Sequence, residues 1–140
     1  MTRRRAGPRE SPERPPLGDL ELEVMHVVWE LGECTSGDVI AAFRSKRELA
    51  PSTIRNVLAN LRAKGWVRPI PAIGRGFTLQ PTTPRDAAAK RSLQSLLASW
   101  FGGSTQRAIA SLLDDEEISQ ADLDQIGRLL KARRRGGDSR

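Results

Sequence analysis

Residues 50–63 constrain the fold of this chain more strongly than any other segment. Ala50-Pro51 places a proline where it suits the first turn of a helix. The apolar side chains that follow have the i, i+3, i+4, i+7 spacing of one buried helix face: Ile54, Val57, Leu58 and Leu61. The sequence therefore predicts a helix with one side packed against other elements.

The opposite face of this helix has an unusual composition. Ordinary solvated helices present glutamate and lysine pairs, whereas this face presents hydroxyl, amide and guanidinium groups: Ser52, Thr53, Arg55, Asn56, Asn60 and Arg62. Such groups form hydrogen bonds with base edges and phosphates of DNA. Taken alone, the helix fits a DNA-reading face and an ordinary polar face equally well.

Two further helices are predicted before this segment. The first follows Asp19, a candidate N-cap, and ends at Gly32, with an apolar stripe of Leu20, Val24, Val27, Val28 and Leu31. The second follows a capping box formed by Thr35 and Asp38, and its apolar face consists of Val39, Ile40 and Phe43.

A basic β-hairpin is predicted after the third helix. Lysine and glycine at 64–65 end that helix, and residues 66–79 have the pattern of two short strands around a turn at 72–76. Pro69 and Pro71 donate no backbone hydrogen bond, which restricts the first strand to a sheet edge or to alternate pairing.

Three helices followed by a hairpin predict a winged helix-turn-helix, so the fold class is mainly α with a small β-hairpin. Arg75 lies between glycines at the tip of the hairpin. This position suits contact with a phosphate or a minor groove, and a solvated turn arginine is the alternative interpretation.

Residues 83–133 are predicted to form a helical dimerisation domain. Capping boxes that begin at Thr83 and Ser119 open two helices, and Gly102-Gly103 separates the first of them from a short middle helix. Helices over about 50 residues expose more apolar surface than they can cover alone, so we expect interdigitation with a second copy. The residues assigned to that contact are Leu93, Leu97, Trp100, Ile109, Leu112, Leu113, Leu123, Ile126 and Leu130.

Both ends of the chain are predicted to be disordered. Residues 1–16, called the basic arm below, hold five arginines and four prolines but almost no apolar side chains, so they cannot offset the entropy of ordering. Added solubility and contact with phosphates are both compatible with this composition. The predicted organisation is the basic arm at 1–16, the winged helix-turn-helix at 17–82, the dimerisation domain at 83–133 and a tail at 134–140.

The positive charge of the chain is concentrated in one stretch. The formal net charge is +6, and residues 17–43 contain six acidic side chains but no lysine or arginine. Residues 44–84, in contrast, contain eight basic side chains against the single acid Glu48. This segregation points to an acidic polymer as the partner.

Composition excludes several classes of site. Cys34 is the only cysteine and His26 the only histidine, so no internal disulfide, cysteine cluster or paired-imidazole metal site can form. The acidic run 114–117 lacks the alternating ligands and turn glycine of a calcium loop. We therefore predict no metal and no cofactor. The absence of an apolar run of about 18 residues or of a secretory leader predicts a cytoplasmic protein without membrane insertion.

Taken together, these segments resemble the BlaI/MecI/CopY penicillinase-repressor family over residues 17–130. The resemblance is carried by LGDLELEVMHVVWELGE, STIRNVLANLRAKGWV, GRG in the wing and FGGSTQRAIASLLDDEEISQADLDQI, in that order. It implies a homodimeric repressor of transcription that binds an inverted-repeat operator in double-stranded DNA until a signal releases it. It also implies base reading by Ser52, Thr53, Arg55 and Asn56, with Asn60, Arg62 and Arg75 towards the DNA backbone.

Two departures from the family pattern affect the expected mode of release. The resemblance implies a sensor protease whose signal leads to cleavage at an Asn-Phe bond, but this chain has Ser111-Leu112 at that place. A protease partner would thus need a different preference. The paired C-terminal cysteines of the copper-responsive branch are absent after Leu130, which argues against copper sensing.

Two other classes of function are weighed against a repressor. A winged-helix module could dock an acidic protein through its basic face, because a fold does not determine its function. A hydrolase with His26 as base is the other alternative, but the chain has no nucleophile elbow, phosphate loop or carboxylate pair to support it. The chain is therefore predicted not to be an enzyme.

Overall fold

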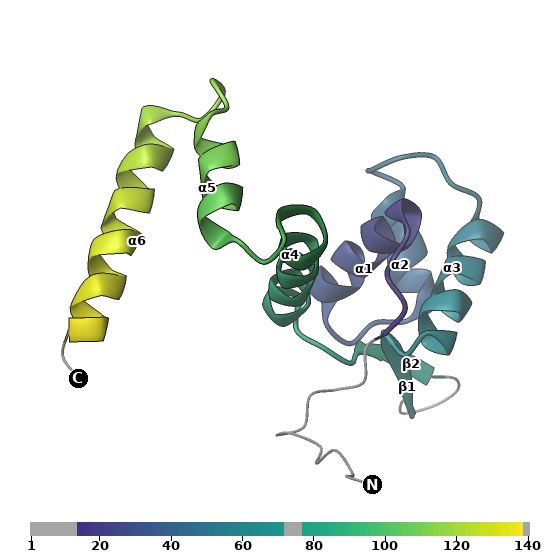
Figure 1. Cartoon of the computed structure of the whole chain (residues 1–140). Coiled ribbons are helices and arrows are strands. Elements are labelled where there is room, and N and C mark those ends of the chain that lie inside the picture. The colour runs from purple at the N-terminus through teal and green to yellow at the C-terminus, as the bar shows by residue number, and fades with distance from the viewer. Residues whose placement is uncertain (1–13, 72–76, 139–140) are drawn as a thin grey trace, which may run out of the picture. The chain divides into compact units, whose positions relative to one another are not determined.

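The computed structural model describes residues 14–71 and 77–138. The first 13 residues of the basic arm, the wing tip with Arg75, and residues 139–140 lie outside the described part. The chain divides into two compact units, Met1–Ala88 and Ala89–Arg140. The elements in chain order (Figure 1) are α1 (Asp19–Leu31), α2 (Ser36–Phe43), α3 (Pro51–Ala63), β1 (Val67–Pro71), β2 (Phe77–Pro81), α4 (Arg85–Phe101), α5 (Thr105–Leu113) and α6 (Gln120–Asp138).

Helix α1 begins with a cap that differs from the predicted one. Gly18 is the N-cap, and its backbone N–H donates to Oε1 of Glu21 over 2.8 Å. Asp19 is the first helical residue, so its prediction as N-cap is wrong by one position. It still favours the helix because an acidic side chain in the first turn offsets the positive end of the helix dipole.

Helix α2 confirms the predicted capping box. The Thr35 hydroxyl accepts from the backbone N–H of Asp38 over 3.0 Å, and the Asp38 carboxylate accepts from the backbone N–H of Thr35 over 2.9 Å. Two backbone donors that have no partner within the helix are satisfied in this way.

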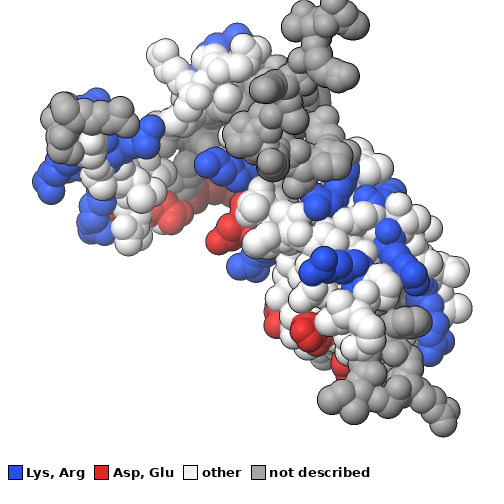
Figure 2. Space-filling view, turned by 90° about the horizontal axis from the view of Figure 1, so that it is seen from below, with Lys and Arg blue, Asp and Glu red and all other residues white. Residues whose placement is uncertain are grey.

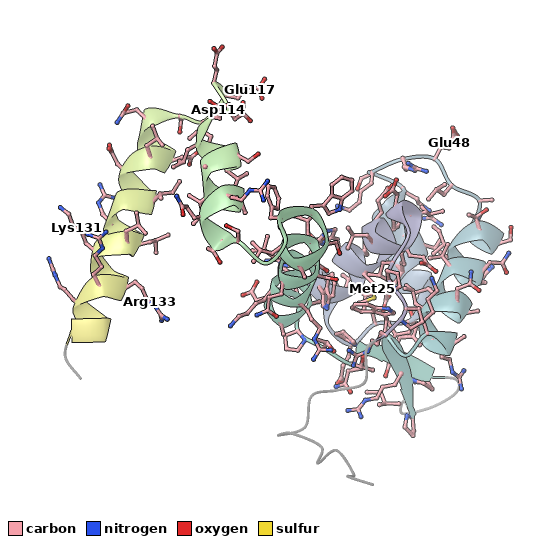
Figure 3. All side chains as sticks on the ribbon, viewed as in Figure 1. Met25, Glu48, Asp114, Glu117, Lys131 and Arg133 are labelled. Atoms are coloured by element: carbon pink, nitrogen blue, oxygen red, sulfur yellow. The ribbon has the colours of Figure 1, made fainter. Side chains whose placement is uncertain are left out.

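The core of the first unit lies between α1, α2 and α3, which contact one another, and β1 packs against α3. The predicted apolar faces of α2 and α3 are buried, as are Val24, Val27 and Val28 of α1. Met25 is also fully buried (Figure 3), whereas Leu31, which was predicted in the stripe, is 43% exposed. The buried face of α1 is therefore rotated towards Met25.

Strands β1 and β2 form the antiparallel hairpin of the wing, with Arg68 opposite Gln80 and Pro69 opposite Leu79. Cys34 extends this sheet: its N–H donates to the Leu79 carbonyl over 3.0 Å, and the Leu79 N–H donates to its carbonyl over 2.6 Å. Three helices packed on a hairpin make this unit a winged helix-turn-helix.

The second unit, unlike the first, consists of helices without a buried core in its described residues. Its helices are separated by Gly102 and Gly103, both with positive φ (56° and 82°), and by a connection in which the Ser119 hydroxyl accepts from the Asp122 N–H. None of its described residues from 89 to 137 is buried. Helix α6 continues to Asp138, so the prediction of a disordered tail from 134 is wrong for residues 134–138. The good helix formers at 131–135 carry the helix past 134, and it extends over Gly136 and Gly137 although glycine disfavours a helix.

We predict that Thr35→Ala lowers the free energy of unfolding by about 1 kcal/mol, since it removes the side-chain acceptor at the start of α2. Denaturant unfolding of both forms measures this difference. Ser36→Ala, one residue later and without a side-chain hydrogen bond in the described structure, is the matched control and should change stability by less than about 0.5 kcal/mol. Equal losses in the two variants would contradict the role of the capping box.

Candidate nucleic-acid interface

The outward face of α3 makes no side-chain hydrogen bond or ion pair with the described residues. Five of its six candidate residues are exposed, and the sixth, Thr53, is half-buried; the exposed ones are Ser52, Arg55, Asn56, Asn60 and Arg62. Because the opposite side of α3 is buried, all six side chains lie on one side of the helix. They present hydroxyl, amide and guanidinium groups to solvent, the chemical groups that form hydrogen bonds with base edges and phosphates.

The C-terminal end of α3 is held by an ion pair to α1. The Lys64 Nζ lies 2.7 Å from Oε1 of Glu21, and the Glu21 side chain is only 13% exposed. The same carboxylate accepts the Gly18 N–H, and these two hydrogen bonds hold the pKa of Glu21 below its usual value of 4.5. The angle of α3 against α1 is thereby fixed at the end where the wing begins.

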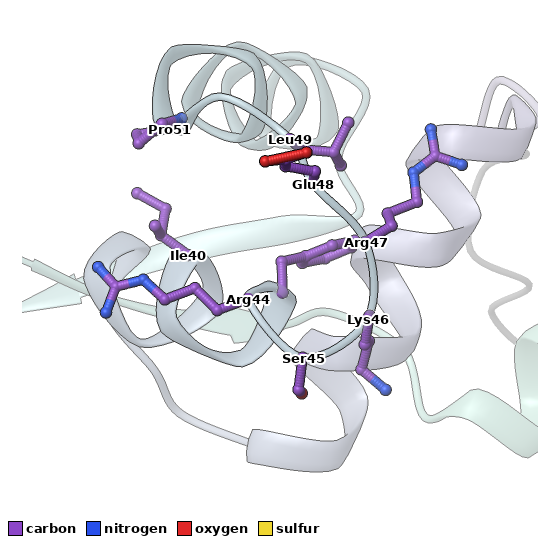
Figure 4. Close-up of a pocket in the computed structure, with 9 residues that line it drawn as sticks. Ile40, Arg44, Ser45, Lys46, Arg47, Glu48, Leu49 and Pro51 are labelled. Carbon is purple, nitrogen blue, oxygen red and sulfur yellow. The ribbon is translucent and has the colours of Figure 1, made fainter.

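The turn between α2 and α3 carries three basic side chains with different surroundings. Lys46 Nζ lies 3.7 Å from Glu30 and Arg47 lies 3.2 Å from Glu23, so acidic residues of α1 partly neutralise both. Arg44 makes no side-chain hydrogen bond or ion pair with the described residues. It lies on the rim of a pocket of about 470 Å³ between α2 and the start of α3 (Figure 4).

Arg44 is a candidate contact that the sequence analysis missed. It lies at the C-cap of α2, and the pocket that it lines also contains Pro51, the first residue of α3. A guanidinium without an intramolecular partner among the described residues, beside the first turn of α3, suits contact with a phosphate. The basic run at 44–47 was the signal that could have identified it.

Charge on the first unit is divided between two sides (Figure 2). Lysine and arginine gather on one side of this unit, whereas aspartate and glutamate lie on another. Arg68 of β1 is held in place by two hydrogen bonds from its guanidinium to Gln80 Oε1, of 2.9 and 3.0 Å. The predicted wing contact, Arg75, lies outside the described residues.

The described residues contain no metal site, no membrane-spanning helix and no reactive thiol. No group of three or more histidine, cysteine, aspartate or glutamate side chains in that part of the chain is placed to hold a metal ion. No helix there is long and apolar enough to cross a membrane. Cys34 is 1% exposed, and burial raises the pKa of its thiol. The protonated thiol is a poor nucleophile.

The second unit exposes most of the apolar side chains that were assigned to dimerisation. Trp100 is 78% exposed, Leu112 63% and Leu93 61%. Leu97 and Ile126 are half-buried, and the remaining members are exposed: Ile109, Leu113, Leu123 and Leu130. Leu96 and Leu129 are exposed apolar residues that the prediction omitted, although their helical spacing places them beside the listed ones.

Comparison with known proteins identifies relatives over most of the chain. Residues 17–132 match the family model described as penicillinase repressor. A 16.5 kDa protein of Latilactobacillus sakei is 34% identical over 113 residues, which cover 81% of this chain and 77% of that protein. The penicillinase repressor of Bacillus licheniformis is 24% identical over 117 residues, which cover 84% and 91%. The solution structure of Bacillus licheniformis BlaI, solved as a monomer with the blaP half-operator, has 30% identity and a TM-score of 0.47 over 53% of this chain and 89% of that one.

We predict that Glu21→Gln destabilises the first unit at neutral pH. Because the folded pKa of Glu21 is lowered, the stability from its ionised form is present above the usual value of 4.5 and is lost as pH falls through the folded pKa. The difference in unfolding free energy between wild type and variant should thus be largest near pH 7. It should shrink as pH falls and approach zero near about pH 2. Denaturant unfolding at both pH values measures it.

Glu33→Gln is the matched control, because Glu33 is exposed and makes no side-chain hydrogen bond in the described structure. It should leave stability unchanged at both pH values. A Glu21→Gln deficit that stays constant with pH would contradict the ion-pair account.

Proposed function

The chain belongs to the penicillinase repressor family, and from this premise we propose that it acts as a homodimer on an inverted-repeat operator. The family is one of transcriptional repressors, so the chain is a DNA-binding repressor and not an enzyme. We place this activity in the cytoplasm.

The outward face of α3 is the observation that carries the proposal. We assign base reading in the major groove to Ser52, Thr53, Arg55 and Asn56. An arginine in this position offers two parallel donors to a guanine edge, and an asparagine pairs in the same way with adenine. The buried opposite face supports this assignment because it turns these polar groups to solvent, where they have no side-chain hydrogen-bond or ion-pair partner among the described residues.

A second set of residues is assigned to the DNA backbone. Asn60 and Arg62 lie towards the C-terminal end of α3, Arg44 lies beside its N-terminal end, and Arg75 belongs to the wing by sequence. Contacts with phosphates fix the protein in register and supply affinity that depends on salt but not on sequence. Discrimination between operators then depends on the four residues assigned to base reading, Ser52, Thr53, Arg55 and Asn56.

Dimerisation is assigned to the second unit. Its described residues include no buried side chain, yet its three helices carry exposed leucine, isoleucine and tryptophan along their length. Exposed apolar surface on this scale marks a protein interface. A second copy supplies the same apolar surface and, through its two-fold symmetry, matches the symmetry of an inverted repeat. We therefore assign residues 17–82 to DNA binding and residues 83–133 to dimerisation, as the sequence predicts.

We propose that separation of the two copies releases the protein from DNA. Two linked half-site contacts bind far more tightly than one, so any event that separates the second units weakens repression. Cleavage within α5, at the Ser111–Leu112 bond, is one such event, because it would break the helix that carries Leu112 and Leu113 of the proposed dimer contact. A protease that recognises this bond is therefore the class of partner we propose for release.

We predict that Arg55→Ala lowers affinity for a duplex selected by the wild-type protein by about 1–3 kcal/mol and relaxes the preference at one base pair. Fluorescence anisotropy on the selected duplex and its single-base variants measures both effects. Arg62→Ala is the matched control, because loss of a phosphate contact should weaken all these duplexes to a similar degree. An unchanged base preference in Arg55→Ala would contradict the assignment of α3.

We predict that Leu112→Asp raises the dimer dissociation constant at least about tenfold, since it places a charge in an apolar interface and removes a buried leucine from each copy. Sedimentation equilibrium measures the constant. Leu22→Asp is the matched control: Leu22 is 40% exposed on α1, in the other unit, and its replacement should leave the constant unchanged. Equal dimerisation of wild type and Leu112→Asp would contradict the proposed interface.

A further inference from the structure

Three residues, called the link below, join the hairpin of the first unit to helix α4: Thr82, Thr83 and Pro84. Strand β2 ends at Pro81 and α4 begins at Arg85, so the link has no length to spare. The ring of a proline also restricts its own φ to about −65°. The path from the winged helix-turn-helix to the first helix assigned to dimerisation is therefore short and has little conformational freedom.

Hydrogen bonds tie the start of the link to the end of α3. The backbone N–H of Thr82 donates to the Trp66 carbonyl over 3.0 Å. The Thr82 hydroxyl lies 2.7 Å from the Gly65 carbonyl oxygen and 3.1 Å from the Trp66 carbonyl oxygen, and donates to them. Gly65 and Trp66 follow Lys64, the C-cap of α3. The link is thus attached directly behind the proposed recognition helix.

A second contact ties the link to α1. Nε1 of Trp29 donates to the Thr83 carbonyl over 2.8 Å. The half-buried Trp29 ring packs against the core, and the ring of His26 meets it edge-on with 5.6 Å between the ring centres. These two contacts hold the indole, so its N–H has a fixed direction. The Thr83 carbonyl is therefore attached to a rigid part of the first unit.

The first turn of α4 belongs to the same unit as the link. Ala88 is the one buried residue of α4 and the last residue of the first unit, and its N–H donates to the Pro84 carbonyl over 3.1 Å. From there α4 continues to Phe101 without a glycine or proline, the usual causes of a kink. Leu93 and Trp100, two residues assigned to the dimer, lie on this helix. The proposed dimer contact is thus carried by a helix whose first turn is fixed to the DNA-binding unit.

We propose that Trp29 and Thr82 are positioning residues that make binding depend on the spacing between the two half-sites. This inference rests on the proposed homodimer and operator and extends them. Subunits joined through flexible linkers reach half-sites over a range of spacings, whereas a stiff connection allows simultaneous binding only where the geometry fits. A link that is held by Trp29 and Thr82 is a stiff connection. The two residues thereby select operators through the link and not through a contact with base edges.

Insertion of one base pair between the half-sites is a sensitive probe of this stiffness. It moves one half-site by about 3.4 Å along the duplex and rotates it by roughly 35° around the duplex axis. A dimer with its links in place must break contacts or deform to follow this change. A dimer with released links follows it at a small cost, and the two half-sites stay occupied together.

Anisotropy titrations with three duplexes test the proposal: a selected operator, the same operator with one inserted base pair, and a single half-site. Wild type should bind the inserted operator at least about tenfold more weakly than the selected operator. Trp29→Phe removes the N–H donor but keeps an aromatic ring against the core, and it should reduce this ratio to less than about threefold. Its affinity for the single half-site should stay within about twofold of wild type, because α3 is unchanged and the unit stays folded.

Two further variants separate the link from general packing. Thr82→Val keeps the shape of the side chain but removes the hydroxyl, and it should reduce the ratio as Trp29→Phe does. Trp66→Phe is the matched control: its indole N–H donates to the Pro15 carbonyl over 3.0 Å, at the end of the basic arm, and only its backbone contacts the link. It should keep the wild-type ratio. Sedimentation equilibrium should give the same dimer dissociation constant for all four proteins, since no substitution lies in the second unit.

The outcomes distinguish failure of this inference from failure of the proposed function. A wild-type ratio in both Trp29→Phe and Thr82→Val would overturn their positioning role while operator binding stands. A ratio in Trp66→Phe that falls as far as theirs would also overturn it, because the effect would then be one of general packing. Wild-type protein that binds both spacings equally would overturn selection by spacing. Wild-type protein that binds selected and scrambled duplexes equally would instead overturn the proposed operator binding.

Discussion

Burial of one face of α3 is the constraint on which the rest of this structure depends. Ile54, Val57, Leu58 and Leu61 are packed against α1 and α2, so the remaining positions of the helix are forced to the surface. A one-residue rotation of α3 would bury Arg55 or Asn56 without partners, at a cost of several kcal/mol. The hydrophobic contact therefore determines the orientation of the polar side chains that we assign to DNA.

Electrostatics complements this packing at both ends of α3. Acidic residues of α1 pair with Lys64 at one end and with Lys46 and Arg47 at the other, which leaves Arg44 without an intramolecular partner. Three of the six acids of residues 17–43, namely Glu21, Glu23 and Glu30, thus serve as a counter-charge for basic groups that are close to the proposed DNA surface. In the second unit most of the apolar side chains that we assign to dimerisation are exposed, and in the proposed dimer a second copy would cover them.

Features set by local spacing could be predicted from the sequence, and features set by distant contacts could not. The helix at 51–63, the Thr35 capping box and the hairpin each follow from residues a few positions apart. The Trp66 hydrogen bond to Pro15 joins residues 51 positions apart, and the Glu21–Lys64 pair joins residues 43 apart. No periodicity encodes such pairs. For the same reason the burial of Met25 was missed, and Arg44 was counted only as one of the basic side chains of residues 44–84.

Binding to DNA tiles from the region upstream of the protein's own coding sequence tests the central claim most directly. Anisotropy of the full-length protein is measured against each duplex at about 0.15 M salt, because affinity for DNA depends steeply on ionic strength. The account predicts saturable binding to a tile that contains an inverted repeat, with scrambled duplex at least about 10³-fold weaker. Equally weak binding to every tile, together with cross-linking to an acidic protein, would contradict it and favour a winged-helix interaction module.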